Sequence, residues 1–317
     1  MKVVVLGATG HVGGYLVPRL VELGHEVMAV SRGRREPYRK HAAWEEVRRI
    51  EMDRKALEAE GAFAGKVLEL SAEIVIDMIC FTAESARRLV EALNGAVQHY
   101  LCCGTIWVHG HSTSVPTTEN APREPFGDYG IGKEQMERYL LEEARLRGFP
   151  ATVLHPGHIV GEGWAPLNPA GNFNPHVFEL LAHGQELILP NLGLETVHHV
   201  HADDVAQGFI KAIANWSVSK GESFHLVSPT ALTLRGYAER VAAWFNRKPQ
   251  LRFLPWEQWK QAASEEDAWY TWDHIAHSPN CSIEKAKRFL GYMPRYSSLE
   301  AVYESLGWLI EHNVISI

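Results

Sequence analysis

The sequence has few cysteines and no long hydrophobic run. Its four cysteines are not spaced like the ligands of a metal site, so we expect the reduced thiols of a cytoplasmic protein. No apolar stretch approaches the ~20 residues that span a membrane. Met1 leads directly into a strand-like segment rather than a secretory signal. We therefore expect no association with a membrane.

Positive charge is also in short supply. Lysine and arginine number 31 against 38 aspartates and glutamates, which gives a net charge of −7. Nucleic-acid binding depends largely on cationic surfaces. We therefore expect no nucleic-acid partner.

Short apolar runs alternate with helical patterns through the first two thirds of the chain. This alternation predicts an α/β fold with a doubly wound parallel sheet, and the near-continuous hydrophobicity of the runs indicates strands covered on both faces. The predicted strands are Val3–Leu6, Val27–Val30, Ile74–Asp77, Tyr100–Cys103, Thr152–Leu154 and Phe224–Val227. The predicted helices include Gly13–Leu23, Ser85–Leu93 and Gly132–Arg147.

A glycine-rich loop directly follows the first predicted strand and opens a helix. Small residues there let the backbone approach a pyrophosphate, and the N–H groups and dipole of the helix N-terminus favour its negative charge. We therefore predict a Rossmann dinucleotide site. The residues expected to bind the cofactor are Gly7, Thr9, Gly10, His11, Val12 and Gly13.

The end of the second predicted strand bears on the choice of cofactor. An Asp or Glu there would hydrogen-bond the adenosine ribose of NAD, but the chain continues with Ser31 and Arg32. A hydroxyl beside a guanidinium suits a 2′-phosphate. We expect NADP to be preferred slightly over NAD, while a solvated basic loop is the alternative interpretation of these residues.

Composition changes indicate a second, smaller and discontinuous C-terminal domain that binds substrate. The stretch from about residue 161 to residue 191 is rich in Pro, Gly and Asn and is expected to be a loop, and tryptophans gather after residue 228. We predict a Rossmann domain from residues 1–160 and 197–228, with a substrate-binding domain from residues 161–196 and 229–317.

Tyr129 and Lys133 are the candidate catalytic pair. They are four positions apart at the start of a predicted helix, which places both on one face. A nearby ammonium favours the phenolate and brings the tyrosine closer to acid–base service at neutral pH. We predict that Tyr129 moves a proton to or from the substrate.

Four further motifs resemble those of the extended short-chain dehydrogenase/reductase superfamily, in its NAD-dependent epimerase/dehydratase group. They are CCGTIWVHG at residues 102–110, HPG at 155–157, HADDVA at 201–206 and LGY at 290–292, followed by Pro294. The resemblance implies hydride transfer to or from a nicotinamide, with Thr105 bonding the reacting oxygen and Lys133 holding the ribose. It also implies that Asp53 meets the adenine and that Met78 and Pro156 contact the cofactor. For His201 and Asp204 we favour a structural role.

The chain departs from relatives that act on nucleotide sugars. Between Arg147 and Lys211 it has no Lys or Arg, although a buried diphosphate needs cations. We expect a small-molecule substrate without a diphosphate, such as a sugar or polyol, contacted by His158 and His199. A nucleotide sugar is the alternative. No metal site is expected near His199, because neighbouring strand residues point to opposite faces.

Two further expectations rest on resemblance. Short segments such as Ile76–Met78 resemble those of the chloroplast stem-loop-binding proteins, which are associated with RNA. A non-catalytic RNA-associated protein is therefore an alternative from another class. The acidic net charge and the intact Tyr129 and Lys133 favour an enzyme.

Fold analogy predicts a homodimer through the helices Ser85–Leu93 and Gly132–Leu146. The sequence leaves simple oxidoreduction, epimerisation and dehydration open.

Overall fold

A computed structural model describes all residues 1–317 and contains a seven-stranded parallel sheet. The strand order is β11-β6-β5-β4-β1-β2-β3, the arrangement of a doubly wound Rossmann sheet. The strands are β1 (Lys2–Leu6), β2 (Glu26–Ser31), β3 (Arg48–Glu51), β4 (Ile74–Asp77), β5 (His99–Cys103), β6 (Ala151–Pro156) and β11 (Ser223–Leu226). The predicted fold class is confirmed.

Six of these strands match the predicted ones to within two residues at each end, and β3 was not predicted. It lies at the edge of the sheet and pairs only with β2. Three of its four side chains are exposed. An edge strand open to solvent has no need of the apolar run that marks a buried one.

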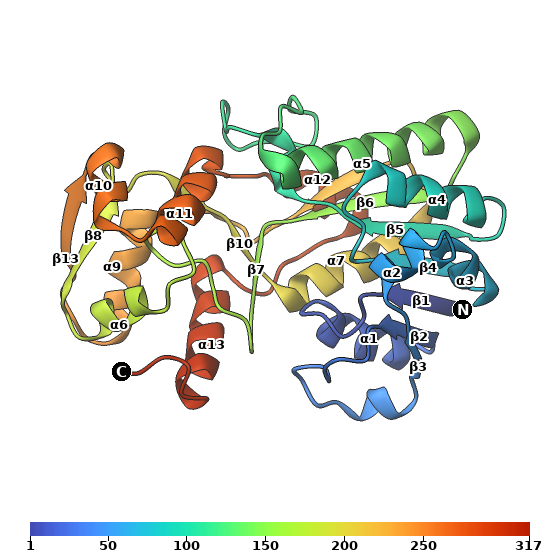
Figure 1. Cartoon of the computed structure of the whole chain (residues 1–317), viewed down its shortest axis with the longest axis horizontal. Helices are drawn as coiled ribbons and strands as arrows, with labels where there is room; N and C mark the ends of the chain where they lie inside the picture. Colours follow the sequence, from blue (N-terminus) through green and yellow to red (C-terminus); the bar gives the residue numbers. More distant parts are fainter.

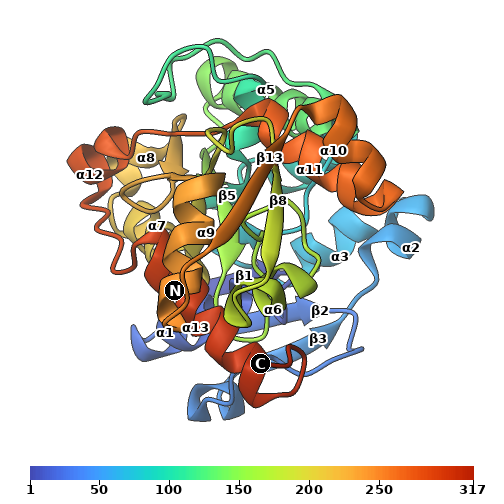
Figure 2. The ribbon, with the colours of Figure 1, turned by 90° about the vertical axis from the view of Figure 1, so that its left-hand side faces the viewer.

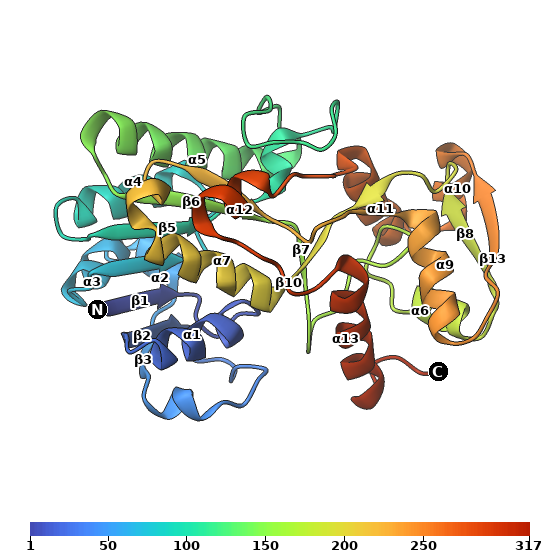
Figure 3. The same ribbon diagram turned by 180° about the vertical axis from the view of Figure 1, so that it is seen from behind.

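Helices cover both faces of the sheet (Figure 1). Figure 3 shows the second of these faces from behind. The first face carries α3 (Phe63–Glu69), α4 (Ala83–Leu93) and α5 (Gly127–Arg147), and the second carries α1 (Gly13–Glu22), α7 (Ala202–Ala214) and α12 (Glu284–Leu290). Short α2 (Arg54–Ala59) and α8 (Trp216–Ser219), with the 3-10 turns η1 (Ala42–Glu45) and η2 (Ile106–His109), complete this half. No helix is both long and apolar enough to cross a membrane.

A second hydrophobic core lies beyond the carboxyl ends of the strands, and Figure 2 looks onto this part of the molecule. Its elements include α6 (His176–Ala182), β8 (Glu186–Pro190), α9 (Leu234–Trp244), β13 (Gln250–Leu254), α10 (Trp256–Ala262), α11 (Glu265–His277) and α13 (Ser298–Glu311). Two strands, β7 (His158–Val160) and β10 (His199–His201), run in parallel toward it. The short strands β9 (Thr196–Val197) and β12 (Leu232–Thr233) pair with each other.

The stretch expected to be a loop at residues 161–191 contains both α6 and β8, so that expectation is wrong in part. The apolar side chains of α6 and β8 pack into the second core, and this packing outweighs the local Pro, Gly and Asn content. Later in the chain, Cys281 and Tyr292 return to the core of the large sheet. By packing, the segment between them belongs with the sheet.

Candidate active site

The glycine loop is shaped by glycines at which a side chain would force the backbone or a neighbour to move. Gly7 has φ +85°, and a Cβ there would lie 2.7 Å from Ile79. A Cβ on Gly13 would lie 1.9 Å from the carbonyl oxygen of Ala8. The loop therefore stays close to the N-terminus of α1 and leaves a backbone cradle at its positive end. These residues fit the pyrophosphate of a dinucleotide.

A cavity of about 570 Å³ runs from this loop to the second core. It includes most of the residues that sequence analysis singled out. Those in its wall are Gly7, Gly10, His11, Val12, Gly13, Met78, Thr105, Tyr129, Lys133, Pro156 and His158. Thr9, Ser31, Arg32, Asp53 and His199 lie outside the wall.

Tyr129 and Lys133 meet at this cavity from the first two turns of α5. The Lys133 ammonium is buried, donates hydrogen bonds of 2.8 Å to Cys80 O and 2.7 Å to Cys103 O, and lies 5.9 Å from the centre of the Tyr129 ring. The tyrosine is 46 % exposed and opens into the cavity. Removal from water raises the pKa of its phenol, while the Lys133 ammonium and the Thr105 hydroxyl act to lower it.

Thr105 follows β5 and caps η2. Its hydroxyl accepts a hydrogen bond of 3.3 Å from Trp107 N, so the backbone uses one of its lone pairs and its proton stays available to a substrate oxygen. Local bonding therefore does not exclude the predicted role.

The far wall of the cavity is aromatic. The imidazole of His158 also lies in this wall and is neutral. Burial, reinforced by His274, holds the pKa of His158 well below its usual range. Lys133 is the only Lys or Arg in the wall, and Asp273 is its only carboxylate. The aromatic side chains there include Trp107, Trp164, Phe173, Trp269 and Tyr270. Of these three tryptophans, only Trp269 comes from the stretch after residue 228 where the sequence analysis noted them.

The predicted ribose and adenine contacts lie apart from the cavity, at the ends of β2 and β3. Ser31 Oγ accepts a hydrogen bond of 3.2 Å from Gly33 N. Asp53 caps α2 and lies 3.4 Å from the Arg34 guanidinium. Arg32 is exposed. These groups remain accessible to an adenosine moiety.

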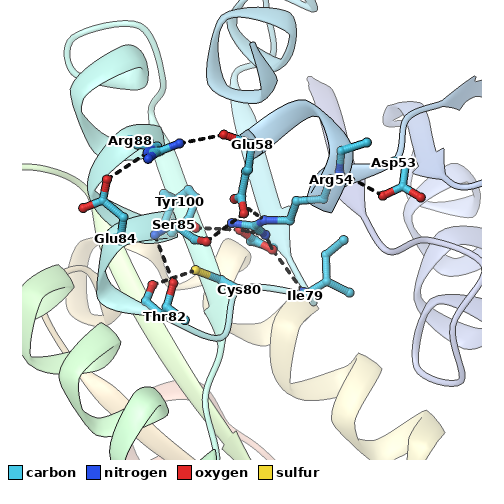
Figure 4. A network of polar contacts seen from close by, with 12 residues as sticks. Asp53, Arg54, Glu58, Ile79, Cys80, Thr82, Glu84, Ser85, Arg88 and Tyr100 are labelled. Carbon is cyan, nitrogen blue, oxygen red and sulfur yellow. Dashed lines mark hydrogen bonds and ion pairs between the residues drawn. The ribbon is translucent and has the colours of Figure 1, made fainter. Parts of the chain in front are cut away.

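A buried ion pair that sequence analysis missed fixes this region. Arg54 donates to both oxygens of Asp77, at 2.8 and 2.9 Å, and Tyr100 Oη donates to the same carboxylate at 2.9 Å. Figure 4 shows Arg54 beside Asp53 at the start of α2, with Tyr100 and Ile79 around its guanidinium. The backbone N–H of Ile79 also donates to Asp77. The pair therefore ties the Asp53 turn to the cavity wall.

The remaining predicted histidines are engaged inside the protein. His199 is buried and its Nε2 lies 3.0 Å from Leu167 O, which leaves it out of reach of the cavity. His201 Nε2 lies 3.0 Å from Glu304, and Asp204 accepts hydrogen bonds from the backbone N–H groups of Arg295 and Tyr296. The structural interpretation of His201 and Asp204 agrees with these contacts.

A glycine loop over a helix N-terminus and a Tyr-Lys pair therefore line one cavity at the carboxyl edge of a Rossmann sheet. Residues 3–226 match the NAD dependent epimerase/dehydratase family, and the chain belongs to that family. It is an enzyme of the NAD-dependent epimerase/dehydratase type.

Curated relatives differ in what their names describe. The chloroplast stem-loop binding protein of 41 kDa b of Arabidopsis thaliana is 26% identical over 96% of this chain and 78% of its own length. A UDP-glucose 4-epimerase of Corynebacterium glutamicum is 24% identical over 96% of this chain and 94% of its own. The 2'-dehydrokanamycin reductase of Streptomyces kanamyceticus is 27% identical over 76% of this chain and 66% of its own.

Solved structures share the fold over nearly the whole chain. A UDP-glucose 4-epimerase from Thermotoga maritima superimposes with a TM-score of 0.74 at 19% identity, covering 99% of this chain and 100% of that one. A UDP-glucuronic acid 4-epimerase from Bacillus cereus, solved with UDP-glucuronic acid and NAD, gives a TM-score of 0.72 at 16% identity, covering 98% of this chain and 100% of that one.

Proposed function

We propose that the protein transfers a hydride between a nicotinamide cofactor and a hydroxyl-bearing or carbonyl carbon of a sugar-type substrate. The observation that carries this proposal is that Thr105, Tyr129 and Lys133 share one cavity with the glycine loop. When bound, the nicotinamide supplies the hydride acceptor or donor. Gly7, Gly10 and Gly13 would hold its pyrophosphate.

The side chains then have distinct roles. Tyr129 gives a proton to, or takes one from, the substrate oxygen, and Thr105 donates a hydrogen bond to that oxygen. An ammonium has three N–H donors, and Lys133 uses two of them on backbone carbonyls. The third is left for a ribose hydroxyl of the cofactor, while its charge favours the phenolate.

Family resemblance favours a nucleotide sugar as substrate. Several UDP-glucose 4-epimerases are among the curated relatives, and a UDP-glucose 4-epimerase shares the whole fold. This supports epimerisation of a sugar attached to a nucleoside diphosphate, the alternative in our sequence analysis, over the diphosphate-free substrate that we first expected.

One observation keeps the diphosphate-free substrate as a second candidate. The wall of the cavity holds a single cation, Lys133, and that cation is committed to the catalytic end. An unpaired buried charge costs several kcal/mol, and the neutral His158 cannot compensate for it. A neutral polyol or sugar would need no such cation.

We propose NADP as the slightly preferred cofactor. Arg32 is exposed, and Arg34 lies beside Asp53 with most of its side chain in solvent. Either guanidinium can pair with a 2′-phosphate, and the end of β2 offers no carboxylate for a 2′-hydroxyl.

Binding and turnover measurements test these proposals together. The purified protein is titrated with NAD and NADP, and then assayed with UDP-glucose and UDP-galactose beside free sugars and polyols. Interconversion of the nucleotide sugars, with no reaction of the free compounds, supports the first candidate. Oxidation of free compounds alone supports the second. A protein that binds neither cofactor would contradict the proposed function.

A further inference from the structure

Three buried histidines come together at one edge of the sheet. His109 lies on η2, His155 on β6 and His225 on β11, and each offers one ring nitrogen within 4.8 Å of the other two. His155 and His225 are direct partners in the pairing of β6 with β11. None of the three lines the cavity, and none has a role in the proposed reaction.

Backbone carbonyls fix the tautomers of two of these imidazoles. His109 Nδ1 lies 3.2 Å from Pro122 O, and His225 Nδ1 lies 3.1 Å from Ser282 O. A carbonyl oxygen only accepts, so these contacts favour a proton on each Nδ1 and a lone pair on each Nε2, although Arg123 Nη1 also lies 3.3 Å from His109 Nδ1. Metal-binding histidines are oriented in this way.

The two Nε2 atoms lie only 2.9 Å apart. A proton on one Nε2 would make this contact a hydrogen bond, whereas two lone pairs at that distance need a cation beside them.

A carboxylate completes the cluster. Glu137 Oε2, from α5, lies 2.9 Å from His155 Nε2, yet neither atom makes a well-formed hydrogen bond. His155 is fully buried and Glu137 is 3% exposed. Two further ligand atoms therefore lie inside the protein without a satisfied partner, which native structures seldom tolerate.

Arg123 is the cation now nearest to the cluster. Its Nη1 lies 2.8 Å from His109 Nε2, and its Nη2 lies 2.8 Å from Glu137 Oε1. Glu119, which accepts the backbone N–H of His225, adds a second carboxylate. Arg123 pairs with Glu137 alone and also donates to Ser223 Oγ at 3.3 Å, and because it is partly exposed and outside any helix or strand it can turn outward.

We infer that His109, His155, His225 and Glu137 form a binding site for a zinc-type divalent metal. Three imidazoles are a ligand set that binds zinc in proteins, and Glu137, beside His155, supplies the fourth ligand in this proposal. The metal takes the place of the Arg123 guanidinium at His109. The sequence predicted no metal site near His199, and it gave no signal for this cluster, whose residues lie far apart in the chain.

Three of the proposed ligands lie on elements that also carry residues of the candidate active site. His109 ends the turn that Thr105 caps, and Glu137 lies on α5 with Tyr129 and Lys133. His155 precedes Pro156, which lines the cavity. Metal binding therefore joins η2, α5, β6 and β11.

The test uses the full-length protein, stripped with a chelator and then equilibrated with micromolar zinc. We expect about one zinc per chain to survive gel filtration and the Tm to rise. Cobalt in place of zinc should give the visible absorption of a tetrahedral site. His225→Ala should lose the metal and the Tm increase, whereas the control His176→Ala, at an exposed histidine, should keep both.

A second variant, Arg123→Gln, keeps the test decisive even if His225→Ala fails to fold. It removes the competing cation but no ligand, so it should bind zinc more tightly than the wild type. Absence of zinc in the wild-type protein, equal zinc in wild type and His225→Ala, or weaker binding by Arg123→Gln would each overturn the inference. Every readout is independent of turnover, so failure of the proposed enzymatic function would leave the result unchanged.

Discussion

Lys133 and Tyr129 lie one helical turn apart on α5, with the lysine Nζ 5.9 Å from the centre of the phenol ring. The ammonium is held by Cys103 O at the end of β5 and by Cys80 O just beyond β4. These two hydrogen bonds to backbone carbonyls of the sheet therefore hold the ammonium in one position. The tyrosine is free to meet a substrate, while the charge that tunes it stays in place.

Removal of the Tyr129 hydroxyl should stop catalysis without unfolding the site. We expect Tyr129→Phe to lower kcat by roughly 10²–10⁴-fold, the usual contribution of a positioned acid or base, and to leave cofactor affinity nearly unchanged. Steady-state kinetics and a cofactor titration measure the two effects. Tyr139→Phe, farther along the same helix, is the control and should behave like the wild type. A near-native rate for Tyr129→Phe would show that the tyrosine is not the acid or base.

The preference for NADP should depend on Arg32. Because a guanidinium pairs with the 2′-phosphate and makes no such contact with NAD, Arg32→Ala should weaken NADP binding and change NAD binding little. Titration of intrinsic fluorescence with each cofactor provides the comparison, with exposed Arg252→Ala as the control. Tighter binding of NAD by the wild-type protein would contradict the preference.

Acid should destabilise the fold through its buried histidines. Burial lowers their pKa to about 4 in the folded protein, against 6.5 in the unfolded chain, so the unfolded chain binds more protons below pH 6.5. Their stabilising contribution is complete above pH 6.5 and is lost as the pH falls toward 4. Each contributes up to about 1.4 kcal/mol per pH unit in that window. These residues are His11, His99, His109, His198, His199, His274 and His277.

Urea unfolding at several pH values between 7.5 and 4.5 measures this dependence. His199→Gln should reduce the slope of the unfolding free energy against pH, whereas His176→Ala, at an exposed site, should not. A free energy that stays constant between pH 7 and 5 would refute the explanation.

The Arg54–Asp77 pair should be costly to break. Asp77→Ala leaves the buried Arg54 guanidinium with only the partly exposed Glu58 as a partner, and the loss of a buried partner typically lowers the free energy of unfolding by up to about 3–5 kcal/mol. Glu186→Ala removes a carboxylate from the exposed pair with Arg252 and should cost about 0–1 kcal/mol. Chemical denaturation of both variants tests the difference. Equal costs would mean that Asp77 contributes no more than a surface charge.

A homodimer remains our prediction for the oligomeric state. Helices α4 and α5 lie side by side on one face of the sheet, where fold analogy places the interface. Light scattering at micromolar concentration should give twice the 35.6 kDa of one chain. A mass of a single chain under those conditions would contradict the prediction.

The buried strands and the glycine loop could be predicted because their signals are local. A strand covered on both faces must be apolar, as at Ile74–Asp77, and a loop that approaches phosphate must be small, as at Gly7 and Gly13. The polar edge strand β3 carries no such signal. The helix α6 could not be predicted from local composition, since its apolar face packs against residues distant in sequence.

The site residues likewise differ in whether a local sequence pattern indicates them. Tyr129 and Lys133 could be paired because one helical turn fixes their spacing. The Arg54–Asp77 pair and the contact of His109 with His225 depend on strands being brought together by the sheet. No pattern within a short window records such contacts.

The return of residues 281–292 to the large sheet sets the order in which the molecule can be completed during synthesis. A nascent chain that has emerged as far as Leu226 already contains all seven strands of the sheet. It still lacks Cys281, Leu290 and Tyr292, which fill the core on the α7 side. We expect the growing chain to expose that apolar face until translation is almost finished, so that truncations before residue 281 aggregate rather than yield a cofactor-binding fragment.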